Sequence, residues 1–216
     1  MQVGKYTVEY LEDSHIYLVN GVITASITQL LKKHFPMAES IPQNILENAR
    51  KRGNRVHKEI EDYEHLESIK EPSTELKNYV ELKDKHKFNV VDVEKIVVLE
   101  KDGQVVACGR LDQLIEIDGE LAINDIKSTY KLNYEYLYHQ TNLYRIAHNQ
   151  TYGTDIKKCY ATHLKGATSK FKSIPSDDEI VAKIIDEYLE SHKEEELEIE
   201  EIWKIGQGTT LVYLNN

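Results

Sequence analysis

Three segments rich in β-branched residues follow one another in the middle of the chain with almost no room between them. They cover residues 90–99, 105–117 and 121–126, and the dipeptides Asp102-Gly103 and Asp118-Gly119 fall at the two junctions. Asp-Gly is a favoured pair for two-residue hairpin turns, because both central positions need a positive φ. Segments joined by such turns pair in an antiparallel sense. The pattern therefore predicts three successive antiparallel strands, around which the rest of the chain has to pack.

The later segments alternate between helical and strand periodicity. Helices are predicted at residues 43–66, where Gly53 interrupts the spacing, at 74–87 and at 134–149. A strand is predicted at 157–164, and an acidic helix opens after Pro175-Ser176-Asp177. We expect Trp203 and residues 209–214 to form a final strand or a docking arm. These elements predict an α/β fold with a central mixed β-sheet flanked by helices.

The N-terminal part has a different character. Residues 6–24 alternate polar and apolar side chains and contain Asn20-Gly21, which predicts a β-hairpin or a short meander. Ser26 is placed to cap a short helix that Pro36 ends. With 216 residues and 40% hydrophobic content, we expect a single domain. Its parts are the N-terminal hairpin and helix at 5–35, a core at about 43–175, and an acidic helix and tail at 176–216.

The net charge of −10 argues against an anionic ligand, because affinity for DNA comes largely from Lys and Arg. The acidic excess is local, however. Residues 177–201 contain 12 acidic residues and two lysines, which leaves the remainder of the chain neutral. Four basic groups can line a positive surface or simply face solvent: Lys32-Lys33-His34, Arg50-Lys51-Arg52 with Arg55, Lys157-Lys158, and residues 165–172.

Cysteine content and hydropathy exclude several classes of protein. Cys108 and Cys159 stand alone in apolar segments, so we expect buried, inert thiols and neither a disulfide framework nor a cysteine metal cluster. No stretch approaches the roughly 18 apolar residues of a membrane span. The first six residues lack the layout of a signal peptide. We therefore expect a cytoplasmic protein that does not contact a membrane.

The central strands carry the most specific chemical pattern. Asp125 and Lys127 point to the same face of their strand, with Ile126 directed into the core. The turn at 118–119 folds the strand that carries Asp112 against them. Two carboxylates at close range repel each other unless a cation lies between them, and hard oxygen ligands suit Mg²⁺ or Mn²⁺. A lysine beside such an ion can orient or deprotonate the attacking water and offset negative charge on a phosphate.

In this pattern the chain resembles the PD-(D/E)XK nuclease superfamily. That family has an Asp at a β-hairpin, here Asp112, and then Asp or Glu, any residue and Lys on the next strand, here Asp125-Ile126-Lys127. Gln140 and Tyr144 match the Gln-x-x-x-Tyr feature of its RecB-like branch, and residues 52–57 are similar to the helix of that branch whose His binds metal. Residues 15–28 are also similar to the opening of phage exonucleases of this branch.

The resemblance implies a restriction-endonuclease-like core with catalytic residues Asp112, Asp125 and Lys127. It implies an ion held by Asp112, Asp125, His57 and the Ile126 backbone carbonyl, and the imidazole favours Mn²⁺ over Mg²⁺. Further expectations concern supporting residues. Gln140 and Tyr144 are expected to brace the site or to hold a DNA phosphate, and Arg52 and Arg55 are weaker candidates. Glu94 lies on the preceding strand within reach of the ion through water, but the sequence favours a solvated residue there.

The function that the resemblance implies is an exonuclease that acts on DNA ends in phage-type recombination or repair. Expected partners are DNA, a single-strand annealing protein, and further copies of the chain in a ring. The four cysteines of the iron–sulfur relatives are absent, so no iron–sulfur cluster is expected. Two alternatives stay open: a structure-selective endonuclease, and a DNA-binding or scaffold module that has lost catalysis. For the tyrosines at 130, 134, 136 and 138 we favour packing over base stacking.

Overall fold

The structure is a computed structural model that describes residues 1–12, 15–36 and 42–193. Its centre is a five-stranded sheet in the order β5 (Asn89–Lys101), β6 (Gln104–Ile117), β7 (Glu120–Lys127), β8 (Lys158–His163) and β9 (Lys170–Ile174). The β7 and β8 strands run parallel, and the other neighbours are antiparallel. The expected α/β fold with a mixed central sheet is confirmed. The strand or arm predicted at 203–214 lies outside the described residues.

Both Asp-Gly junctions form the predicted turns. Asp102 and Asp118 have φ values of 51° and 54°, and the glycines that follow them have 79° and 76°. The parallel pair β7–β8 needs a long crossover, which α4 (Tyr134–Tyr152) provides. The β9 strand is not predicted by the sequence: residues 170–172 belong to one of the four basic groups, but residues 170–174 form the last strand of the sheet beside β8.

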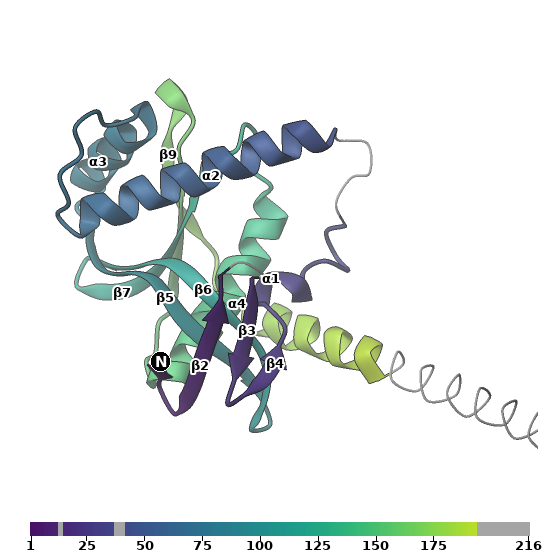
Figure 1. The fold of residues 1–216 in the computed structure, drawn as a ribbon. Helices are drawn as coiled ribbons and strands as arrows, with labels where there is room; N and C mark the ends of the chain where they lie inside the picture. Colours follow the sequence, from purple (N-terminus) through teal and green to yellow (C-terminus); the bar gives the residue numbers. More distant parts are fainter. Residues whose placement is uncertain (13–14, 37–41, 194–216) are drawn as a thin grey trace, which may run out of the picture.

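Helices cover both faces of this sheet (Figure 1). On one face, α2 (Gln43–Glu64) and α3 (Thr74–His86) bury Val56, Ile60 and Leu76 against Ile115 and Ile126 of the sheet. On the other face, α1 (Ile27–Leu30), α4 and the helix at 178–193 enclose a second cluster with apolar residues of β5, β6 and β7. The α2 helix continues through Gly53, so the predicted interruption is wrong; open space surrounds that glycine. No helix in the described part of the chain is long and apolar enough to span a bilayer.

The N-terminal segment forms a small antiparallel sheet that lies against the central one (Figure 1). Its strands are β1 (Gln2–Val3), β2 (Tyr6–Leu11), β3 (Ile16–Val19) and β4 (Val22–Thr24). Val8 and Val19 pack on Val98 and Cys108 of the central sheet. Ser26 caps α1 as predicted, because its hydroxyl accepts the Gln29 N–H and the Gln29 side chain accepts the Ser26 N–H. This docking places β2 and β3 beside one end of β5 and β6.

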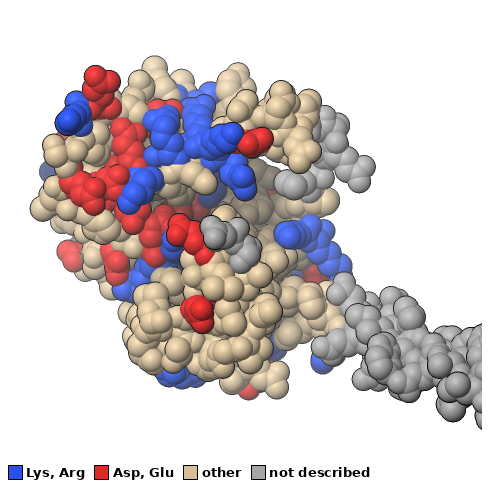
Figure 2. Space-filling view, in the orientation of Figure 1, with Lys and Arg blue, Asp and Glu red and all other residues tan. Residues whose placement is uncertain are grey.

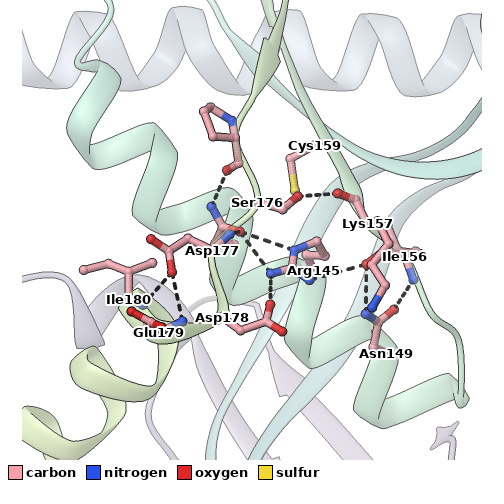
Figure 3. A network of polar contacts seen from close by, with 12 residues as sticks. Arg145, Asn149, Ile156, Lys157, Cys159, Ser176, Asp177, Asp178, Glu179 and Ile180 are labelled. Carbon is pink, nitrogen blue, oxygen red and sulfur yellow. Dashed lines mark hydrogen bonds and ion pairs between the residues drawn. The ribbon is translucent and has the colours of Figure 1, made fainter.

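A buried arginine anchors the C-terminal helix. Arg145 of α4 is 1% exposed, and its guanidinium donates to the Asn142 side chain, the Ile156 carbonyl and the carboxylate of Asp178 (Figure 3). Asp177 opens the helix as predicted: its carboxylate accepts the N–H groups of residues 179 and 180 at 2.9 and 3.0 Å. Cys108 and Cys159 are buried and free, and burial raises the pKa of Cys159 to about 11. Both observations agree with inert thiols.

Candidate metal centre and cleft

Three carboxylates lie in one row across three neighbouring strands. Val93 pairs with Gln113 and Lys95 with Leu111, which places Glu94 of β5 opposite Asp112 of β6. On the other side of β6, Gln113 pairs with Asn124. Asp112 therefore lies one step beyond that pair, beside Asp125 of β7. The register of the two hairpins thus gathers negative charge from segments that are up to 31 positions apart in the sequence.

His57 of α2 lies next to this row of carboxylates. Its Nε2 lies 3.0 Å from the Ile126 carbonyl oxygen. Since a carbonyl can only accept, Nε2 carries a hydrogen and donates it. The other ring nitrogen, Nδ1, lies 3.6 Å from Asp112 Oδ1 and 3.7 Å from Glu94 Oε1. One ligand atom from each of His57, Glu94 and Asp112 falls within a group whose members are all within 4.8 Å of one another.

The charges around His57 determine its protonation. Burial lowers the pKa of the imidazole, but the carboxylates of Asp112 and Glu94 outweigh burial and raise the pKa to about 9. A proton on Nδ1 thus supplies positive charge between the two carboxylates at neutral pH. A divalent cation bound to Nδ1 would take the place of that proton, as is usual for imidazole ligands.

Asp112 is held in place by the backbone. Its Oδ2 accepts the Ile126 N–H at 2.7 Å, which leaves Oδ1 directed toward His57. Ile126 therefore braces two side chains of the site at once, Asp112 through its N–H and His57 through its carbonyl. Hydrogen bonds of this kind fix the orientation of metal ligands and the tautomer of a histidine.

Asp125 and Lys127 form a tight ion pair on the same face of β7. The Lys127 Nζ lies 2.8 and 2.6 Å from the two carboxylate oxygens. Burial raises the pKa of Asp125, and Asp112 adds to that rise, while Lys127 opposes it. For Lys127, burial lowers the pKa, but Asp125 and Asp112 outweigh burial and hold it above its usual value. Lys127 is thus a charged donor at neutral pH.

Glu94 and Asp112 of this row form part of the wall of an open cleft of about 730 Å³, whereas Asp125 is 3% exposed and does not line it. The central sheet contributes Glu94, Gly109, Arg110 and Asp112, and α2 contributes His57 with basic and polar neighbours. Figure 2 shows Lys and Arg gathered over the middle of α2, with Asp and Glu toward its C-terminal end. The N-terminal sheet and the start of α1 supply the opposite wall, through Tyr10, Glu12, His15, Tyr17, Ser26 and Thr28.

Gly109 permits a close approach that shapes this cleft. A Cβ at this position would lie 3.0 Å from the Tyr144 ring and 3.1 Å from Ile27, closer than side chains normally come. Tyr144 of α4 can therefore lie across β6 beside the carboxylates. Burial raises the pKa of its hydroxyl, and Asp112 raises it further. The glycine directly before Arg110-Leu111-Asp112 thus serves the packing of the site rather than a turn.

The other residues that the sequence proposes for the site lie in different surroundings. Gln140 is buried on α4, and its Oε1 has no hydrogen-bond partner among the described residues. Arg52 and Arg55 lie outside the cleft and pair with Glu75 of α3 at 2.9 and 3.4 Å. Glu94 is not the solvated residue that the sequence favours, since its side chain is 21% exposed and faces His57.

The sequence reasoning missed Arg110. Its Nε lies 2.7 Å from Glu94 Oε2, and its guanidinium lies 5.3 Å from the centre of the Tyr10 ring. Arg50 was placed in a general basic group, but it is the arginine of α2 that lines the cleft. The only indication for Arg110 in the sequence was its position two residues before Asp112 on the same strand face.

Comparisons with known proteins leave the family open. No protein-family model matches the chain, and no curated protein matches it. Among solved structures, SSO0001 is similar at 13% identity and a TM-score of 0.37, covering 76% of this chain and 83% of its own. A protein from Eubacterium rectale named "Putative exonuclease" is similar at 12% identity and a TM-score of 0.40, covering 78% of this chain and 71% of its own. Likeness at this level carries no argument about function, which has to come from the site.

Proposed function

We propose that this chain is a metal-dependent nuclease that hydrolyses phosphodiester bonds in DNA. The observation that carries the proposal is the row of Glu94, Asp112 and Asp125 across β5, β6 and β7, with His57 Nδ1 3.6 Å from Asp112 and Lys127 beside Asp125. The carboxylates supply a site for a hard cation, and Lys127 supplies a fixed ammonium group next to it. The same residues, apart from Glu94, carry the resemblance to the PD-(D/E)XK superfamily in the sequence.

The donor set fits Mn²⁺ or Mg²⁺. Oxygen ligands from Glu94 and Asp112 suit hard cations, and one neutral imidazole nitrogen shifts the preference toward Mn²⁺. The Nε2–H bond to Ile126 leaves the Nδ1 lone pair for the ion. Asp125 and the Ile126 carbonyl stay predicted ligands; the carbonyl retains a second lone pair after it accepts from His57.

The protein groups divide the remaining chemistry between them. A bound divalent cation supplies charge neutralisation at the phosphate and lowers the pKa of water. Lys127 keeps its proton, so its role is to donate a hydrogen bond that orients the nucleophile and offsets charge at the reacting phosphate. Arg50 and Arg110 offer further positive charge in the same cleft for the neighbouring phosphates. Exonuclease action on DNA ends, a phage-type recombination or repair role, an annealing partner and a ring-shaped oligomer rest on the sequence resemblance.

End-labelled linear duplex and closed circular duplex, incubated with Mn²⁺, Mg²⁺ or excess EDTA, test the proposal. We expect loss of linear DNA from its ends with either metal, at least as fast with Mn²⁺ as with Mg²⁺, and intact circles. Rapid opening of the circles would identify an endonuclease instead. Binding of linear DNA without any cleavage in either metal would favour the scaffold alternative.

A further inference from the structure

Two exposed tyrosines outside the cleft each have the ammonium group of a lysine over the ring. Tyr130 lies in the loop between β7 and α4, and Lys165 Nζ lies 3.9 Å from the centre of its ring. Tyr134 is the first residue of α4, and Lys172 Nζ of β9 lies 4.6 Å from its ring centre. These four residues are called the tyrosine–lysine patch. Of the four tyrosines for which the sequence favours packing, Tyr136 and Tyr138 pack against the core, but Tyr130 and Tyr134 are 82% and 47% exposed.

The patch is continuous with the metal centre. Across β8, Asp125 pairs with Ala161, and Ala161 pairs with Lys172. Lys172 therefore lies in the same row of the sheet as Asp125, two strands away and about 10 Å distant at the usual strand spacing. The neighbouring row runs from Lys127 through His163 to Lys170. The lysines of β9 thus extend the face of the sheet that carries the catalytic candidates.

The loop that carries Tyr130 is tied to the same edge of the sheet. The Thr129 carbonyl lies 2.7 Å from His163 Nε2, and the Leu164 N–H donates to the Lys127 carbonyl at 2.7 Å. At the start of α4, the Asn133 side chain accepts the Tyr136 N–H. The two rings are therefore presented by anchored backbone, three and seven positions after Lys127.

The two segments that carry the patch are basic up to Tyr134, which Glu135 follows. Residues 128–134 and 163–174 contain Lys131, Lys165, Lys170 and Lys172 and no Asp or Glu. Over the described residues, none of these four lysines forms an ion pair with a carboxylate, whereas Lys127 and Lys158 do. In a protein of net charge −10, such a segment is complementary to an anionic ligand.

We infer that the tyrosine–lysine patch binds single-stranded DNA, with bases stacked on Tyr130 and Tyr134 and phosphates held by the lysines. Stacking on a side chain needs an open base face, which a single strand offers and the interior of a duplex does not. The lysine over each ring is flexible and can move to a phosphate as the base arrives. The inference rests on the proposed function for the identity of the ligand as DNA, and it extends that function to an unpaired strand that leaves or approaches the metal centre.

Binding without cleavage tests the patch independently of catalysis. The full chain is titrated in EDTA against a fluorescein-labelled single strand of thymidines and a blunt hairpin duplex, and anisotropy is measured. We expect Tyr130→Ala/Tyr134→Ala to weaken single-strand binding by about tenfold or more, and duplex binding by less than about twofold. The Tyr130→Phe/Tyr134→Phe variant keeps the stacking faces and should bind like the wild type.

The lysines have a separate readout. Lys165→Gln/Lys172→Gln should lower the salt dependence of single-strand binding by roughly 0.7 in the log–log slope for each lysine removed. Lys157→Gln, an exposed lysine that pairs with Asp155, serves as the matched control and should leave the slope unchanged. The inference is overturned if the double alanine variant binds the single strand like the wild type, or if it loses single strand and duplex equally. A protein that shows the expected binding but never cleaves DNA would keep the patch and refute the proposed nuclease.

Discussion

At the scale of residues, Glu94 combines strain with a position at the candidate metal centre. Its φ of 49° lies in the left-handed region, which is uncommon for a residue with a long side chain and costs free energy. The surrounding strands hold it there, and its carboxylate faces His57 and Arg110. Strained residues of this kind tend to occur at functional sites, and this observation motivates a test of Glu94.

Replacing Glu94 by Gln should weaken Mn²⁺ binding by about tenfold or more, because the change removes a charged ligand and keeps the size of the side chain. Titration calorimetry measures the affinity. The matched control is Asp92→Asn: Asp92 lies on the same strand but pairs with Lys95 outside the cluster of ligand atoms. An unchanged Mn²⁺ affinity in Glu94→Gln would remove Glu94 from the metal centre.

Replacing Lys127 by Ala should separate chemistry from binding. The variant loses a positioned donor at the reacting phosphate, so we expect the single-turnover cleavage rate to fall roughly 100-fold or more. DNA affinity measured with Ca²⁺ should change only a few-fold, because Arg50 and Arg110 remain in the cleft. If affinity falls in step with the rate, Lys127 is a phosphate anchor, and another group must handle the water.

At the scale of elements, the sequence predicted what local chemistry determines. The Asp-Gly pairs need positive φ and formed both turns, and the alternation along β7 placed Asp125 and Lys127 on one face. The sequence did not predict the register, that is, which residues of neighbouring strands lie opposite each other. If the pairing of Asn89 and Val90 continued without the register shift between residues 90 and 92, Val93 rather than Glu94 would lie opposite Asp112. The docking of β2 and β3, which brings Tyr10 and Tyr17 to the cleft, also depends on contacts distant in the sequence.

The α4 helix contains a buried histidine that should make stability depend on pH. His148 is 1% exposed, and its Nε2 has no hydrogen-bond partner among the described residues. Burial lowers its pKa to about 4, and Lys95 contributes to the fall. Because the folded pKa lies below the unfolded value near 6.5, its stabilisation is complete above pH 6.5 and is lost as the pH falls toward 4. The loss should reach roughly 3 kcal/mol.

Urea unfolding at several pH values between 7 and 4 measures this loss. His148→Gln removes the titration, so the difference in unfolding free energy between the wild type and the variant should shrink as the pH falls. His192→Gln, at an exposed position, controls for the removal of a histidine. Parallel stability curves for the wild type and His148→Gln would show that His148 does not titrate differently on folding.

At the scale of the whole molecule, charge is segregated. The excess of acidic residues lies in residues 177–201, whereas the cleft is lined by both acidic and basic residues and the tyrosine–lysine patch contains only lysines as charged residues. The central sheet connects them, since one row of residues runs from Glu94 through Asp112 and Asp125 to Lys172. Lys172 of β9 thus continues the row that carries the carboxylates of the candidate metal centre.

The central claim is that cleavage of DNA requires a divalent cation held at the row of carboxylates. The most direct measurement is the single-turnover rate on end-labelled linear duplex in Mn²⁺, for the wild type and for Asp112→Asn, with an excess of EDTA as the metal-free condition. Asp112→Asn keeps an oxygen that can accept from the Ile126 N–H but removes the charge next to His57. We expect a loss of roughly 100-fold or more in the variant and no cleavage in EDTA. Cleavage by Asp112→Asn at the wild-type rate, or undiminished cleavage in EDTA, would contradict the account.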